Sequence, residues 1–178
     1  TRATALTTQD GVYVKNGAAT RRYLGTIRTT SSTGQCEDSE DRRFVWSYYN
    51  QVKKRSEARL AYGLYTYATQ TWRSVKNSTT VGETRYEFVV GLDTYATASH
   101  NFHNRYMYGN VVFDSTTGGS VGFALYGHNG DPDYPNGSVY ARGSQYLSPG
   151  FHFAQAIEFG INSSSGGFES QLEGDILC

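Results

Sequence analysis

The stretch "TRYEFVVGL", residues 84–92, alternates large apolar side chains with charged or small ones. Four apolar side chains recur at every second position: Tyr86, Phe88, Val90 and Leu92. Arg85 and Glu87 occupy positions between them. Successive side chains of a β-strand point to opposite faces of the sheet, so this pattern predicts a strand with one face buried and the other in water.

Two other windows, residues 56–68 and 151–161, show the same alternation. In "SEARLAYGLYTYA" the predicted buried set is Ala58, Leu60, Tyr62 and Leu64, and the set opposite it is Glu57, Arg59 and Gly63. In "FHFAQAIEFGI" the predicted buried set is Phe151, Phe153, Ile157, Phe159 and Ile161, and the set opposite it is His152, Ala156 and Glu158. Separate parts of the chain therefore predict half-buried strands.

The chain of 178 residues has the size of one domain and is rich in residues that suit sheets. It holds 15 tyrosines, 9 phenylalanines and 20 glycines but only 3 prolines. Short strand candidates alternate with turn-rich stretches, and no helical pattern is long enough for parallel crossovers. The sequence predicts an all-β fold, an antiparallel β-sandwich that is jelly-roll-like in its connections.

Residues 34–52, "GQCEDSEDRRFVWSYYNQV", are the one stretch in which a helix competes with a strand. The acidic residues would complement a helix N-terminus, and Phe44 and Tyr48 are four residues apart. Phe44, Trp46 and Tyr48 also alternate as they would in a strand. We expect one short helix near residues 38–45 that leads into a strand.

Residues 1–33 contain two short strand candidates, and residues 34–178 contain the patterns of the sandwich. The leading segment has few large apolar residues. We expect Val12, Val14 and Leu24 to be buried against the rest of the domain or against a neighbouring chain. Because the sequence starts without a methionine, we expect the chain to be the C-terminal part of a longer protein.

The formal charges balance, with 16 Lys and Arg against 16 Asp and Glu. A neutral chain creates no overall field that would attract nucleic acid or an anionic membrane. The sequence also lacks an apolar run of the roughly 18 to 20 residues needed to span a bilayer. We therefore expect no nucleic-acid partner and no membrane insertion.

Patterns that would indicate catalysis or metal binding are weak. No serine lies in a nucleophile-elbow sequence, so a catalytic triad would have to be assembled from distant parts of the chain. His100 and His103 suggest zinc, but residues three apart in a strand point to opposite faces. Four acids are interleaved with arginines and are expected to be solvated rather than catalytic: Glu37, Asp38, Glu40 and Asp41. We expect no enzyme activity and no cofactor.

Residues 131–137, "DPDYPNG", gather the oxygen ligands that calcium prefers: Asp131, Asp133 and Asn136. Pro135 occupies a ligand position of the EF-hand pattern, and the closing glutamate of that pattern is absent. Asp, Pro, Asn and Gly are also the ordinary residues of a long turn. We assign no metal here and keep these three residues as weak calcium candidates.

The two cysteines, Cys36 in a polar stretch and Cys178 at the last position, make no disulfide framework. Two free thiols are the simpler interpretation. A bridge between them stays open as the alternative.

The surplus of tyrosines is compatible with a recognition surface. A tyrosine combines an apolar ring with a polar tip, and it serves both half-buried sheet positions and binding surfaces. Sugars stack on exposed aromatic rings, so a tyrosine-rich β scaffold suits a carbohydrate-binding protein, although most of the tyrosines are expected to be structural.

Two stretches resemble a known group of proteins. Residues 4–52 include "DGVYVKNGAATRRYLGTIRTTSSTGQCEDSEDRRFVWSYYN", and residues 147–160 are "LSPGFHFAQAIEFG". The first closely resembles a segment that recurs in structural proteins of tailed bacteriophages, and the second resembles their C-terminal element. Cys36 and "VKKRS" depart from the pattern, and residues 53–145 do not share it.

The resemblance implies a non-enzymatic component of a phage particle, namely a tail or head fibre, a spike or a decoration protein, located on the virion and binding the host surface. It implies a homotrimer that contacts other virion proteins, with a host polysaccharide or protein as its ligand. A long polar loop holds the candidates for receptor contact: His128, Asp131, Asp133, Tyr134 and Asn136. Two alternatives stay open, a cement protein without a receptor role and a spike enzyme that degrades polysaccharide.

Overall fold

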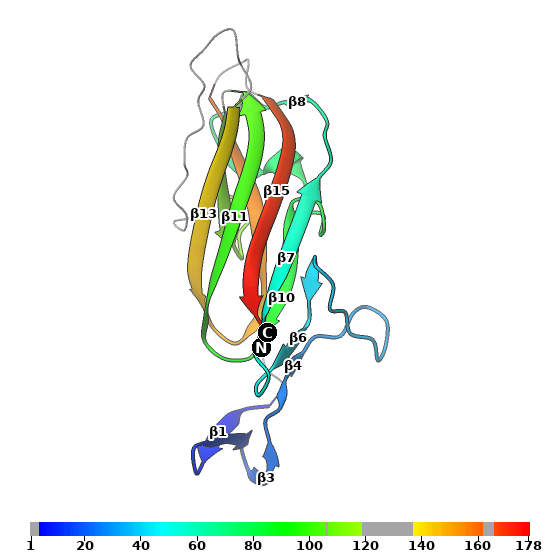
Figure 1. Ribbon diagram of the computed structural model, residues 1–178, viewed down its shortest axis with the longest axis vertical. Coiled ribbons are helices and arrows are strands. Elements are labelled where there is room, and N and C mark those ends of the chain that lie inside the picture. The colour runs from blue at the N-terminus through cyan, green and yellow to red at the C-terminus, as the bar shows by residue number, and fades with distance from the viewer. Residues whose placement is uncertain (1–3, 106, 119–136, 162–165) are drawn as a thin grey trace.

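A computed structural model of the chain describes residues 4–105, 107–118, 137–161 and 166–178. These residues form β-strands and a single 3-10 turn at Val75–Asn77. Two five-stranded sheets face each other as a β-sandwich, and two smaller sheets extend from one end of it (Figure 1). The predicted all-β, mainly antiparallel sandwich is thus confirmed.

The first large sheet is built around one long central strand. Its members are β12 (Met107–Phe113), β14 (Gly150–Gly160), β10 (Arg85–Val90), β5 (Arg42–Arg43) and β9 (Trp72–Ser74). β14 pairs with β12 along one edge, and with β10 and then β9 along the other edge. All pairs are antiparallel except the short pair of β5 with β10.

The second large sheet contains the longest strands. Its members are β13 (Gly137–Leu147), β11 (Thr94–Arg105), β15 (Gly166–Leu177), β7 (Lys53–Leu60) and β8 (Tyr65–Thr66). β11 lies between β13 and β15, and β7 forms the far edge beside β15 (Figure 1). Segments far apart in the sequence therefore lie next to one another on this sheet.

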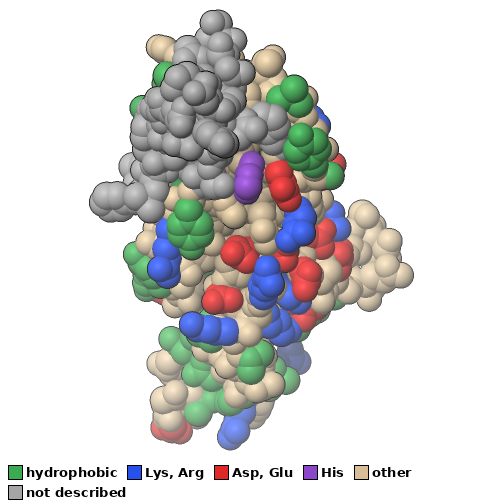
Figure 2. Space-filling model, turned by 45° about the horizontal axis from the view of Figure 1, so that its top comes forward, with side chains coloured by type: hydrophobic (Ala, Val, Ile, Leu, Met, Phe, Trp, Pro, Cys, Tyr) green, Lys and Arg blue, Asp and Glu red, His purple; other side chains and the backbone are tan. Residues whose placement is uncertain are grey.

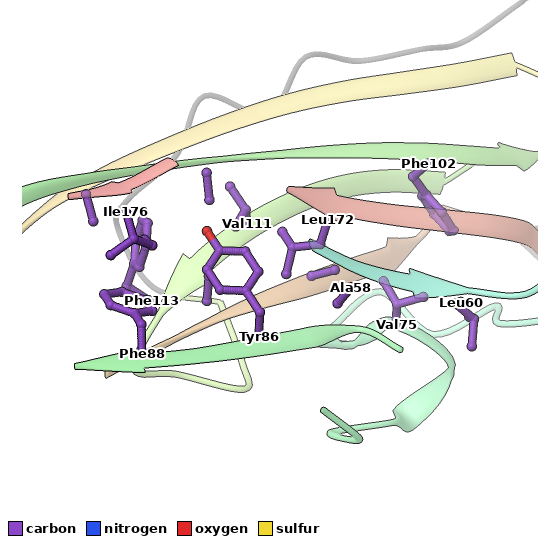
Figure 3. Packing of buried hydrophobic residues seen from close by; sticks show 14 of the residues in the cluster. Ala58, Leu60, Val75, Tyr86, Phe88, Phe102, Val111, Phe113, Leu172 and Ile176 are labelled. Carbon is purple, nitrogen blue, oxygen red and sulfur yellow. The ribbon is translucent and has the colours of Figure 1, made fainter. Parts of the chain in front are cut away.

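The main core fills the space between these sheets. Tyr86 and Phe88 rise from β10 toward Leu172 and Ile176 on β15 of the facing sheet (Figure 3). Tyr86, Phe88 and Val90 are fully buried, as the alternation in residues 84–92 predicted, while Leu92 is only half-buried. Gly174 on β15 faces the tip of Tyr86, and a side chain there would collide with the phenol oxygen.

The smaller sheets carry a second, aromatic core. They consist of β1 (Leu6–Gln9), β2 (Val12–Lys15) and β3 (Ala18–Arg22), and of β4 (Gly25–Ile27) with β6 (Val45–Ser47). Tyr23, Phe44 and Trp46 pack with Val89 on the outer side of β10. This cluster attaches the leading strands to the outside of the first sheet.

The short helix expected at residues 38–45 is wrong. Arg42 and Arg43 form β5, and the backbone N–H of Glu87 on β10 donates to the carbonyl of Asp41 at 2.9 Å. Phe44 and Trp46 are both buried, which requires the two-residue period of a strand. The acids bind neighbouring cations instead of capping a helix.

The expected buried face of residues 151–161 is only partly right. Ile157 is fully buried as predicted, but β14 turns its other face to the main core. The residues on the inner side are His152, Ala154, Ala156 and Glu158, all buried. Phe151, Phe153 and Phe159 lie half-buried on the outer side. The sheet accepts this arrangement because guanidinium groups cover two of these rings: Arg28 lies 3.5 Å from the ring centre of Phe151, and Arg85 lies 3.5 Å from that of Phe153.

Two further expectations about buried residues are only partly met. Ala58 and Leu60 are buried, but β7 ends at Leu60, and Tyr62 and Leu64 beyond it are exposed. In the leading segment Val14 is buried, whereas Leu24 remains exposed. The apolar residues of the leading segment are therefore not all covered by this chain.

Candidate binding surface

The outer face of the second sheet is open to solvent and polar. Along β11 the side chains of Tyr95, Thr97, Ser99 and Asn101 point outward, and those of Ala96, Ala98, His100 and Phe102 point into the core. Side chains of both charge signs cover this face (Figure 2). The outer face of the first sheet is different, because aromatic rings of its own strands lie on it and Arg28 and Arg85 cover two of them.

A hollow of about 370 Å³ runs over the middle of this outer face. Its floor is formed by the short side chains of Thr97 and Ser99 on the central strand β11. Longer side chains on the two neighbouring strands form its walls: Tyr140 and Arg142 on β13, and Glu173 and Asp175 on β15. In the strand register, Ser99 pairs with Arg142 on one side and with Glu173 on the other. We call the hollow formed by these six residues the trough.

The trough has balanced charge. Arg55, which also lines it, donates to Glu173 at 2.9 Å and contacts Glu57 at 3.0 Å, so these groups hold one another in place. Arg142 and Asp175 make no ion pair with any residue that the structure describes, and both are exposed. The trough therefore presents one available guanidinium and one available carboxylate from opposite walls.

Three exposed tyrosines lie along the same face. Tyr95 on β11 and Tyr146 on β13 are direct cross-strand partners, 64% and 65% exposed, and Tyr140 at the rim of the trough is 49% exposed. The hydroxyl groups of Tyr95 and Ser144 are 3.0 Å apart. Exposed aromatic rings beside hydrogen-bonding groups are typical of surfaces that bind polar ligands.

A buried polar cluster around Glu158 serves the fold. Its carboxylate accepts hydrogen bonds from Arg73 Nε at 2.8 Å, from the Lys76 backbone N–H at 3.1 Å and from the Tyr65 hydroxyl. Burial raises the pKa of Glu158, and these donors oppose that rise. The carboxylate is inaccessible and its oxygens are occupied, so we assign it to packing of β14 against the turn at Val75–Asn77.

The pKa values of the two buried histidines are shifted in opposite directions. His100 donates from Nδ1 to the carbonyl of Asn110 at 3.1 Å, and its Nε2, 2.8 Å from Ser170 Oγ, accepts from that hydroxyl. Burial lowers the pKa of His100 to about 4, so the ring is neutral at pH 7.

His152 lies with Nδ1 2.7 Å from Asp114 Oδ2 and Nε2 2.7 Å from the carbonyl of Ser148. Burial disfavours the charged ring, but the hydrogen bonds to Asp114 and Ser148 outweigh it and raise the pKa of His152. Both ring nitrogens face acceptors, which is the arrangement that suits an imidazolium.

The zinc interpretation of the "HNFH" motif gains no support. His100 is buried in the core and His103 is exposed on the outer face, so the two rings point to opposite sides of β11. Within the described ranges, no three His, Cys, Asp or Glu side chains gather as metal ligands would. Cys36 is exposed and Cys178 is buried, and neither is in a disulfide.

Three of the four acids at residues 37–41 form ion pairs: Glu37, Asp38 and Asp41. Glu37 pairs with Arg42 at 3.3 Å, and Asp38 pairs with Arg43 at 3.5 Å and with Lys54. These carboxylates are partly shielded rather than fully solvated, and each has a cation beside it. The pair of Asp38 with Lys54 fastens the segment before β6 to β7.

The receptor-contact and calcium candidates lie outside the described residues: His128, Asp131, Asp133, Tyr134 and Asn136. The sequence patterns alone did not predict the trough. The signal that could have found it is "TYATAS", residues 94–99, where alanines alternate with tyrosine and hydroxyl residues as they do in a strand with a polar outer face.

Comparison with known proteins adds no assignment. No protein-family model matches the chain, and no curated protein matches it. Among the described residues, no helix has the length and apolar character that crossing a membrane requires.

Proposed function

We propose that this chain is a non-enzymatic binding protein on the particle of a tailed bacteriophage, and that the outer face of its second sheet contacts the host surface. The particle setting rests on the resemblance of residues 4–52 and 147–160 alone. A jelly-roll-like order of the strands and contacts with other virion proteins are part of the same proposal.

One observation carries the binding role. The sheet face presents a trough with two hydroxyls and exposed tyrosines beside it, and its Arg142 and Asp175 form no ion pair with any residue that the structure describes. Polar groups held in fixed positions on a concave surface are what a ligand needs for orientation and specificity.

The test is attachment of the labelled chain to intact bacteria from a broad panel of strains. Thr97→Trp fills the floor of the trough with a residue that suits a strand, and Thr20→Trp on exposed β3 is the matched control. We expect the unaltered chain and the control to bind the same strains and Thr97→Trp to bind at least about fivefold more weakly. Binding to no strain would refute the proposed function and favour a cement protein.

The predicted loop contact is tested in the same assay. Replacing Asp133 and Tyr134 by alanine should weaken attachment if the loop takes part, and unchanged attachment would remove the loop from the proposal. Shortening of host polysaccharide by the purified chain would instead show the spike enzyme.

We also propose that the chain assembles as a homotrimer. Leu24 is 70% exposed and Ile27 is 65% exposed beside a hollow of about 600 Å³ that Leu6 and Tyr23 help to line. Apolar side chains grouped in this way favour a protein contact. Light scattering should give a trimer for the unaltered chain and a monomer for the double variant Leu24→Ser and Ile27→Ser with an unchanged circular dichroism spectrum. A monomeric unaltered chain would refute the assembly.

A further inference from the structure

We infer that the trough binds an uncharged oligosaccharide that lies extended along β11. This inference rests on the proposed function, and it specifies the chemical class of the ligand. The shape of the trough, the charge of its walls and the position of the tyrosines all favour such a ligand.

The shape suits a linear polymer. Side chains with outward positions on β11 run from Tyr95 to Asn101, a distance of about 20 Å at about 3.3 Å per residue. The walls on β13 and β15 run parallel to this line because the registers on both sides of β11 are continuous through residues 97–103. A ligand with several similar units in a row can therefore meet the same kinds of groups repeatedly.

The charge of the lining argues against a polyanion. Arg55 and Arg142 are balanced by Glu173 and Asp175, so the lining has no net formal charge. A nucleic acid or an acidic polysaccharide would be repelled by the two carboxylates as much as it is attracted by the two cations. It would therefore gain little free energy from the release of counterions. Neutral hydroxyl groups can donate to Asp175 and accept from Arg142, and a sugar carries both capabilities on each ring.

The tyrosines supply the apolar part of the contact. The face of an aromatic ring carries partial negative charge and attracts the slightly positive C–H groups on one side of a pyranose. Tyr95 and Tyr146 form one such pair at the end of the face, and Tyr140 stands at the rim of the trough. A sugar chain can thus stack at Tyr140 and at the pair while its hydroxyls reach the floor at Thr97 and Ser99.

A protein ligand fits this surface less well. The centre of a protein interface is usually apolar and dry, with polar groups at the rim. The trough has the reverse order, since hydroxyl and charged groups occupy its centre and the tyrosines lie toward its edges.

The experiment is affinity electrophoresis of the purified full chain in native gels that contain dextran, galactomannan or mannan, with hyaluronate as the polyanionic gel. Retardation by at least one neutral polysaccharide is expected. Tyr140→Ala and Arg142→Ala should each raise the dissociation constant at least about fivefold. The matched controls Tyr62→Ala and Arg21→Ala, at exposed positions away from the trough, should leave it unchanged.

Retardation by hyaluronate alone, or by none of the gels, would overturn the inference. The inference would also be overturned if the trough variants and the control variants weakened binding to a neutral polysaccharide by the same amount. Whole-cell binding separates this failure from failure of the proposed function. If cells still bind the chain after periodate oxidation of their glycans but lose binding after protease treatment, the ligand is a protein. This result would refute the inference of a glycan ligand and leave the proposed host attachment intact.

Discussion

The buried neutral state of His100 predicts a specific loss of stability in acid. In the folded protein the ring is enclosed in the core, stacked on Phe102, and hydrogen-bonded to Asn110 and Ser170. In the unfolded chain the same ring is solvated and titrates near its ordinary pKa. Because folding lowers the pKa of His100, the unfolded state binds the extra proton first as the pH falls.

The magnitude follows from the two pKa values, 6.5 for the ordinary ring and about 4 in the fold. At pH 7.5 and above, His100 is almost entirely unprotonated in both states and contributes almost no pH dependence. Between pH 7.5 and pH 5 the unfolded state gains about 2 kcal/mol relative to the folded state, and the limit below pH 4 is about 3.4 kcal/mol. This is a large share of the stability of an ordinary domain.

The assay is urea unfolding at several pH values between 7.5 and 5, on the unaltered chain and on His100→Gln. Glutamine can donate to Asn110 and accept from Ser170, but it does not titrate. We expect the unaltered chain to lose about 2 kcal/mol more than the variant over this range. His103→Gln, on the exposed face, is the control for the loss of one imidazole. Equal losses in the unaltered chain and His100→Gln would refute the buried neutral ring.

Three further stability predictions follow from buried polar groups. Tyr86→Phe should leave the free energy of unfolding in urea unchanged or raise it by up to about 1 kcal/mol, because the Tyr86 hydroxyl is buried beside Gly174 and has no hydrogen-bond partner among the described residues. A loss of more than about 1 kcal/mol would show that this hydroxyl has a hydrogen-bond partner. Glu158→Gln should cost about 2 kcal/mol at pH 7, since one of the two oxygens that accept from Tyr65, Arg73 and Lys76 becomes an amide nitrogen that cannot accept. Unchanged stability would contradict the assigned structural role. Asp114→Asn should lower the pKa of His152 in an NMR titration. The stability that the raised His152 pKa supplies is fully present below pH 6.5 and is lost as the pH rises through the pKa of the folded state. The free energy of unfolding of the variant should therefore lie further below that of the unaltered chain at pH 6 than at pH 8. A His152 pKa that stays the same in the variant would exclude this pairing.

Periodicity identified the strands more reliably than it identified which face of each strand is buried. In residues 84–92 the large aromatic side chains share one face, while the other face carries Arg85, Glu87 and the smaller Val89, and Tyr86 and Phe88 are buried as predicted. In residues 151–161 both faces carry apolar residues, and the small side chains of Ala154 and Ala156 lie in the main core with the large rings of the neighbouring strand β10. The phenylalanines then go outward and are covered by Arg28 and Arg85, which come from distant parts of the chain.

The expected helix at residues 38–45 failed for a related reason. Acidic residues before an apolar segment suit a helix N-terminus, but they suit ion pairs equally well. Here Lys54 and Arg43 lie close enough to bind Asp38, and β10 offers backbone donors to the segment. Tertiary pairing therefore decided a choice that local propensity left balanced.

The trough shows why a binding surface of this kind is hard to recognise from sequence. Its floor comes from residues 97–99, and its walls come from residues 140–142 and 173–175, so no short motif contains it. Each strand contributes only an ordinary alternation of small, charged and aromatic residues. The trough forms only when β13 and β15 pair with β11 in the observed register, which places the long side chains of β13 and β15 on either side of the short side chains of β11. A change of register by one residue would turn these side chains into the core, so the same pairing that buries Ala98 and Phe102 also creates the candidate site.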